Sequence, residues 1–173
     1  MASIRPGRSY HKPKKKAYTR ISVHKPRKSY VKGVPASKIH QFEMGKKEEY
    51  PLTFNLVSKH DVQIRSNSLE SARITTLKCL TKKLGENNFF FKVLIYPHNV
   101  LRENSMATGA GADRFSQGMR KSFGKPIGLA ARVKKGQKII TVNANKNSEA
   151  GVRLALKRAT SKLPGSFYIK MVK

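Results

Sequence analysis

The stretch 67–97 reads NSLESARITTLKCLTKKLGENNFFFKVLIYP. In its first part, apolar side chains recur every three or four residues, at Leu69, Ala72, Leu77, Leu80 and Leu84. This period is typical of an amphipathic helix, and Gly85 is placed to end it. Asn67 and Glu70 have the spacing of a capping box. The pattern therefore predicts a helix over 67–84.

The second part of this stretch changes to a period of two. Phe89, Phe91, Val93 and Ile95 would lie on one face of an extended chain. This alternation predicts a strand over 89–96 that ends at Pro97, since proline cannot donate a backbone hydrogen bond.

The same periodicities predict the other elements of a domain over 50–173. Strands are expected from residue 51, at 62–65, at 100–103 and at 167–172. Strands 127–133 and 138–145 are expected to pair across a turn at Lys135–Gly136. A second helix, capped by Ser148, would run toward Pro164 with Val152, Ala155, Leu156, Ala159 and Leu163 facing the core. Strands and helices that do not alternate regularly indicate an α+β fold, with a small, mostly antiparallel sheet and two long helices.

The residues before this domain form a basic arm over 1–49. Its first 42 residues carry twelve Lys or Arg and no Asp or Glu, in a chain of 173 residues with a formal net charge of +28. Prolines interrupt it and no apolar period is sustained, so the arm is expected to build no core. Charge of one sign at this density predicts a polyanionic partner, with nucleic acid as the leading candidate.

A second basic region follows residue 100. The stretch 101–138 holds nine basic and two acidic residues, which is unlike the mixed charges of an ordinary solvated surface. Phe115 and Phe123 lie among these cations, where they would either contact ribose and bases or pack in the core. Between the strands, 104–112 (NSMATGAGA) is uncharged and has little to bury, which predicts an exposed, mobile loop.

Other functions find little support in the sequence. The five histidines are scattered without metal-ligand spacing, and the single cysteine, Cys79, allows neither a disulfide within the chain nor a cysteine cluster. Gly118 to Lys125 differs from a phosphate-binding loop in its spacing and in Pro126. Glu103 is expected to balance Arg102, and Asp113 to cap a turn. We expect no enzyme activity, cofactor, metal, small-molecule substrate or membrane partner. The alternatives are a cytosolic RNA-modifying enzyme and a basic nucleic-acid packaging protein.

One segment resembles a known family. PHNVLRENSMATGAGADRFSQGMRKSFGKPIGLAARVKKGQKI (97–139) is similar to the signature of the archaeal and eukaryotic large-subunit ribosomal protein "ten-e", the counterpart of bacterial protein "sixteen". Its GADR, GMR and FGKPIG motifs (111–114, 118–120 and 123–128) fall in the family's order. AYTR, VQIR and SLESAR (17–20, 62–65 and 68–73) do so too. The chain departs from the family in extra basic residues around AYTR, including two HKP units.

The resemblance implies an α+β ribosomal protein in the cytoplasm that binds large-subunit rRNA near the A site. It implies A-site and P-site tRNA and neighbouring ribosomal proteins as further partners. It also places an internal loop near the peptidyl transferase centre. The residues of that tRNA-proximal loop would be Asn104, Ser105, Met106, Ala107, Thr108, Gly109, Ala110 and Gly111.

Charge and ring-bearing side chains mark two sets of residues for RNA binding, and the resemblance implies that this RNA is rRNA. In the arm they are Arg5, Arg8, Tyr10, Lys12, Lys14, Lys15, Lys16, Tyr18, Arg20, Lys25, Arg27, Lys28 and Lys32. In the domain they are Arg65, Arg102, Arg114, Arg120, Lys121, Lys125 and Arg132.

Overall fold

The computed structural model describes residues 5–13, 17–19, 24–25, 31–104, 109–114, 119–120 and 123–172. In these residues the α-helices are α1 (Ser66–Leu84) and α2 (Glu149–Thr160). The strands are β1 (Glu43–Gly45), β2 (Leu52–Ser58), β3 (Val62–Arg65), β4 (Phe89–Val93), β5 (Asn99–Glu103), β6 (Lys125–Val133), β7 (Lys138–Ala144) and β8 (Phe167–Val172). Short 3₁₀ turns are η1 (Gly7–Ser9), η3 (Ala112–Arg114) and η4 (Lys146–Ser148).

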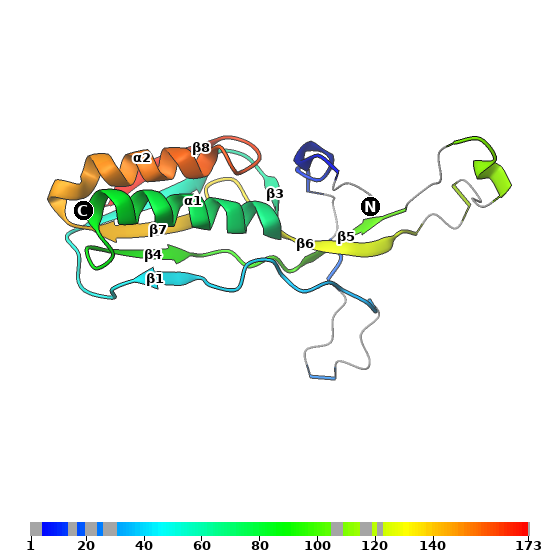
Figure 1. The fold of residues 1–173 in the computed structure, drawn as a ribbon, viewed down its shortest axis with the longest axis horizontal. Helices are drawn as coiled ribbons and strands as arrows, with labels where there is room; N and C mark the ends of the chain where they lie inside the picture. The colour runs from blue at the N-terminus through cyan, green and yellow to red at the C-terminus, as the bar shows by residue number, and fades with distance from the viewer. Residues whose placement is uncertain are drawn as a thin grey trace.

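The strands form two antiparallel sheets. A five-stranded sheet has the order β1-β4-β7-β2-β8, and a three-stranded sheet has the order β3-β6-β5. Both helices pack on one face of the five-stranded sheet, and the three-stranded sheet extends beyond them (Figure 1). The α+β prediction is confirmed, with two sheets in place of one.

The main core lies between the helices and the five-stranded sheet. The alternation read from the sequence is confirmed on β4, where Phe89, Phe91 and Val93 are buried against this core. The strand ends at Val93 instead of Tyr96, although Ile95 is still buried. The five apolar residues predicted to face the core from the second helical segment are also buried.

The predicted pairing of the two strands on either side of Lys135–Gly136 is wrong. β6 and β7 do not pair, because β6 lies between β3 and β5 while β7 lies between β4 and β2. The turn between them bonds instead to the end of β2, where the Gly136 amide donates to the Ser58 carbonyl (2.8 Å). It therefore carries the chain from one sheet to the other.

The predicted helix caps are also absent as hydrogen bonds. α1 begins one residue early, with Arg65 at the N-cap and no side-chain cap bond. Glu70 is engaged elsewhere, since it receives two hydrogen bonds from Arg73. Ser148 does occupy the N-cap of α2, but its side chain makes no cap hydrogen bond.

The arm contributes to the core, contrary to the expectation. Ile39 is 1% exposed and belongs to the main core, and β1 pairs with β4. Gly45 makes this pairing possible: its φ is +84°, and a Cβ there would lie 2.2 Å from the Phe89 carbonyl oxygen. The apolar residues of 31–45 are isolated among polar ones, which is why no period revealed them.

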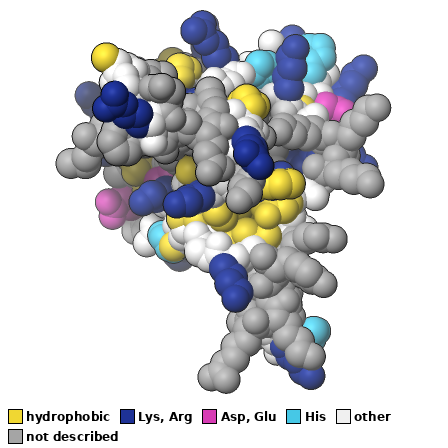
Figure 2. Space-filling view, turned by 90° about the vertical axis from the view of Figure 1, so that its right-hand side faces the viewer, with side chains coloured by type: hydrophobic (Ala, Val, Ile, Leu, Met, Phe, Trp, Pro, Cys, Tyr) yellow, Lys and Arg dark blue, Asp and Glu magenta, His cyan; other side chains and the backbone are white. Residues whose placement is uncertain are grey.

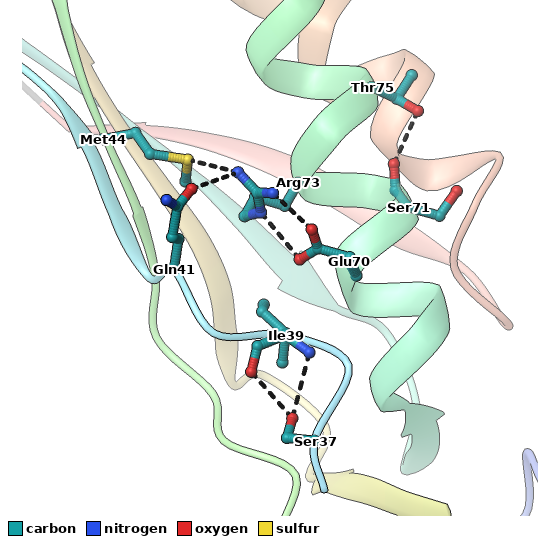
Figure 3. A network of polar contacts seen from close by, with 8 residues as sticks. All are labelled: Ser37, Ile39, Gln41, Met44, Glu70, Ser71, Arg73 and Thr75. Carbon is teal, nitrogen blue, oxygen red and sulfur yellow. Dashed lines mark hydrogen bonds and ion pairs between the residues drawn. The ribbon is translucent and has the colours of Figure 1, made fainter.

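A polar network fixes this segment to α1 (Figure 3). The Arg73 guanidinium donates to Glu70 on its own helix, to the Gln41 side-chain oxygen (3.2 Å) and to the Met44 sulfur. The hydrogen bond from Arg73 lowers the pKa of the Glu70 carboxyl. Nearby, the Ser37 hydroxyl donates to the Ile39 carbonyl (3.0 Å). These bonds set the path by which the chain leaves the three-stranded sheet and enters β1.

Candidate nucleic-acid interface

The N-terminal segment, residues 5–13, lies against the three-stranded sheet, and its backbone carbonyls accept hydrogen bonds from β3. The Gln63 amide on β3 donates to the His11 carbonyl (2.7 Å), and its side-chain amide donates to the Tyr10 carbonyl (2.8 Å). Arg65 donates from Nη1 to the Arg5 carbonyl (2.7 Å). Residues separated by more than fifty positions in sequence are thus held together.

Glu103, at the end of β5, holds two side chains of this segment. It accepts hydrogen bonds from Arg5 Nε (2.6 Å) and from the Tyr10 hydroxyl (2.9 Å). Burial raises the pKa of the Tyr10 hydroxyl, and the hydrogen bond to Glu103 raises it further, because both favour the neutral phenol. The expectation that Glu103 balances Arg102 is wrong, since its partner is Arg5.

Arg102 points to a different ring. Its guanidinium carbon lies 4.0 Å from the centroid of the Tyr18 ring, close enough for a cation–π interaction. The Tyr18 backbone is fixed on both sides: its amide donates to Asn99 Oδ1 (2.7 Å), and its carbonyl accepts from the Val100 amide (2.8 Å). Tyr18 also packs on a small cluster of Val31, Val100 and Leu129.

A cavity of about 280 Å³ opens between the N-terminal segment, the start of α1 and strands β5 and β6. Three predicted RNA-binding residues, Arg5, Tyr10 and Arg65, line it together with Glu103. Figure 2 shows this end of the molecule, where apolar side chains gather at the centre and Lys and Arg side chains stand around them. Acidic side chains are sparse in this view.

The remaining predicted residues are distributed along the same end. Those with exposed side chains are Arg8, Lys12, Lys25, Lys32, Arg102, Arg114, Arg120 and Lys125, while Arg132 is partly buried on β6. Arg114 lies in η3, on the segment between β5 and β6 that extends away from the helices (Figure 1). Lys14, Lys15, Lys16, Arg20, Arg27, Lys28 and Lys121 lie outside the described residues.

The loop and its aromatic neighbours are described in part. Asn104 is partly buried, and Gly109, Ala110 and Gly111 are exposed. Ser105, Met106, Ala107 and Thr108 lie outside the described residues, as does Phe115. The core alternative for Phe123 is wrong, because its side chain is 81% exposed.

Basic residues in two further places were not among the predicted binding residues. Lys38 lines the cavity, and both helices carry exposed lysines: Lys78, Lys82 and Lys83 on α1, and Lys157 on α2. A signal was present, since the last turn of each helix carries two adjacent basic residues, Lys82 and Lys83 on α1 and Lys157 and Arg158 on α2. Those positions were used only to define which face is apolar.

No group of three or more His, Cys, Asp or Glu side chains that could hold a metal occurs in the described part of the chain. Within the same residues, no helix combines the length and apolar character needed to cross a membrane.

Comparison with known proteins identifies the family. The model of the family "Ribosomal protein L16p/L10e" matches residues 13–170. The chain belongs to this family. The resemblance read from the motifs in 97–139 is thereby confirmed, and the match also includes most of the arm.

Archaeal relatives in this family align along nearly their whole length. "Large ribosomal subunit protein uL16" of Methanococcus maripaludis is 44% identical over 172 residues, covering 99% of this chain and 95% of the relative. The protein of the same name from Methanococcus aeolicus is 46% identical over 163 residues (94% and 90%). That from Methanoculleus marisnigri is 47% identical over 161 residues (92% and 91%).

Proposed function

We propose that this chain is a structural component of the large ribosomal subunit in the cytoplasm, where it binds large-subunit rRNA near the A site. Family membership over 13–170 and relatives named as large-subunit proteins support this proposal. The proposal rests chiefly on the surface at the end of the molecule where the arm, β3 and β5 meet. There Arg5, Arg65 and Arg102 lie around a surface on which Glu103 is the one acidic side chain among the described cavity-lining residues.

The chemistry of this surface suits RNA backbone and unpaired bases. Guanidinium groups bind phosphate oxygens, and an exposed ring such as that of Phe123 can stack on ribose or bases. The protein acts here by binding and not by catalysis. Its partners are rRNA, neighbouring ribosomal proteins, and tRNA in the A and P sites through the 104–111 loop.

Sedimentation of a cell lysate tests the structural role. The chain is expected to travel with the large subunit and to stay there through a moderate salt wash, because many contacts must break together for it to leave. Recovery of the whole chain in the light fractions before any salt wash would contradict the proposal.

The loop's role in positioning tRNA needs a separate variant. Replacing 105–111 by a short linker should leave subunit occupancy near normal and slow peptidyl transfer, because the segment has no charge to hold phosphate. Arg114→Ala should reduce occupancy as well, whereas Lys59→Ala, on the turn after β2, should change neither. A shortened loop that prevents subunit association would make it an anchor, and one that leaves both quantities normal would contradict its role.

A further inference from the structure

In the cavity beside the N-terminal segment, a glycine without a side chain leaves open space. Gly128 on β6 lines it, and a Cβ built at Gly128 meets nothing within 4 Å. Gly128 pairs in register with Leu101, which also lines the cavity. A side chain at position 128 would therefore lie on the same face of the sheet as Leu101. The missing side chain leaves bare backbone that a flat group can approach closely.

The walls around this glycine are apolar. Leu101 is 6% exposed, whereas Ile127, which stands without a partner at the register shift between β5 and β6 and also lines the cavity, is 46% exposed. The Tyr10 side chain forms another part of the wall, and Glu103 fixes its hydroxyl. A ring seated here would cover Ile127 and contact Tyr10, which is how unstacked bases are held by proteins.

The polar part of the lining is positively charged. Arg5, Lys38 and Arg65 face one carboxylate, that of Glu103, among the described lining residues. Both oxygens of Glu103 are already used by Arg5 and Tyr10. By contrast, Arg65 Nε is buried and has no hydrogen-bond partner in the described structure. The cavity therefore joins an apolar slot to two cationic side chains that attract an anion, Lys38 and Arg65.

The start of α1 adds to this charge. Ser66 and Asn67 line the cavity, and the first turn of this 19-residue helix has neither an acidic residue nor a side-chain cap. Its leading amides carry partial positive charge, which favours an anion beside Arg65.

We propose that this cavity binds a single unstacked nucleotide of RNA. The base lies on the Gly128 backbone between Leu101 and Ile127, and its phosphate lies beside Arg65 and Lys38. The volume, about 280 Å³, is near the lower end of small-molecule sites (roughly 300–1,000 Å³), which suits one nucleotide and not a longer segment. This inference rests on the proposed function, because it takes RNA as the ligand.

Titration of the full chain with ribonucleoside 5′-monophosphates tests the site. We would follow backbone amide signals by NMR while adding AMP, GMP, CMP or UMP, with inorganic phosphate at matched ionic strength as the control. At least one nucleotide should cause saturable shifts at Asn67, Leu101 and Gly128, at concentrations at least fivefold below those that phosphate needs. Equal effects of nucleotide and phosphate, or shifts that never saturate, would contradict the proposal.

Filling the cavity sharpens the test. Gly128→Met has room for its side chain and should weaken nucleotide binding at least tenfold. Ile127→Ser, which removes an exposed apolar contact, should weaken it severalfold and decides the matter if the methionine variant does not fold. Lys59→Met removes one exposed positive charge away from the cavity and should bind like wild type. Wild-type affinity in Gly128→Met would overturn the assignment.

A parallel measurement with large-subunit rRNA separates the two proposals. If wild type binds rRNA and Gly128→Met still binds mononucleotides normally, the cavity assignment fails while the proposed function stands. If wild type does not bind rRNA, the proposed function itself fails, whatever the mononucleotide result.

Discussion

The two ends of this molecule are stabilised in different ways. Around the five-stranded sheet, large apolar side chains such as Phe54 and Phe91 on the strands and Leu156 on α2 are fully buried in the main core. Around the three-stranded sheet, the separate buried cluster is small (Val31, Val100 and Leu129). The N-terminal segment is held there chiefly by polar contacts. The comparison indicates that the first end maintains the fold, while the second presents cationic groups whose mutual repulsion an RNA partner would relieve.

The largest effect is expected in the main core. Phe91→Ala should lower the free energy of unfolding by about 3–5 kcal/mol, because it removes a fully buried ring and leaves a cavity. Phe123→Ala, at the other end, should change it by less than about 0.5 kcal/mol, since that ring is exposed. Urea unfolding measures both. Similar losses in the two variants would show that the two ends do not differ in this way.

A smaller effect tests whether β1, near the end of the arm, is part of the stable core around the five-stranded sheet. Gly45→Ala should cost roughly 2–3 kcal/mol, from positive-φ strain together with a clash on the Phe89 carbonyl. Gly33→Ala shares the positive φ (+70°) but meets nothing within 4 Å, so it should cost only about 1 kcal/mol. Equal unfolding midpoints for the two variants would argue against the β1–β4 pairing.

At the end of the molecule around the three-stranded sheet, replacing Glu103 should loosen the N-terminal segment without unfolding the core. Glu103→Gln removes the ion pair with Arg5 and should accelerate trypsin cleavage of the N-terminal segment severalfold, while global stability falls by less than about 1 kcal/mol. In wild type this segment should already be cleaved before α1. Glu149→Gln breaks an exposed pair with Arg153 on α2 and serves as the control. Unchanged cleavage in Glu103→Gln would mean that Glu103 does not hold the segment.

The smallest effect concerns acid stability. Because Arg73 lowers the pKa of Glu70 in the folded state, this carboxylate contributes stability at pH values above its ordinary pKa of about 4.3. That contribution is lost as the pH falls through the lowered value. Glu70→Gln should therefore cost up to about 1 kcal/mol at pH 7, and this cost should shrink as the pH falls through the ordinary pKa and vanish below the lowered one. A difference that persisted at low pH would exclude this charge effect.

Local periodicity predicted most elements of the five-stranded end. The apolar residues of α1, β4 and α2 repeat regularly, so their buried faces could be read from sequence. The pairing of β6 and β7 could not, because strand order depends on which faces need burial in the whole fold, and their proximity in sequence suggested a hairpin. Ile39 and Val31 were missed because isolated apolar residues carry no period.

The candidate site was predicted as a list of residues but not as an arrangement. Composition singled out Arg5, Tyr10, Arg65 and Arg102 as RNA-binding residues, and the structure brings the first three to one cavity. That Glu103 joins Arg5 and Tyr10 depends on long-range contacts with no local signal. Gly128 was part of a recognised motif, but its open space became evident only from its register with Leu101.

The salt dependence of rRNA binding tests the central claim most directly. With several phosphate contacts made by the arm and by the region around Arg102 and Arg114, the slope of log K against log salt concentration should be on the order of −5. Arg102→Met should reduce the magnitude of this slope by about one, and Lys59→Met should leave it unchanged. A nearly flat dependence for the wild-type chain would contradict the account.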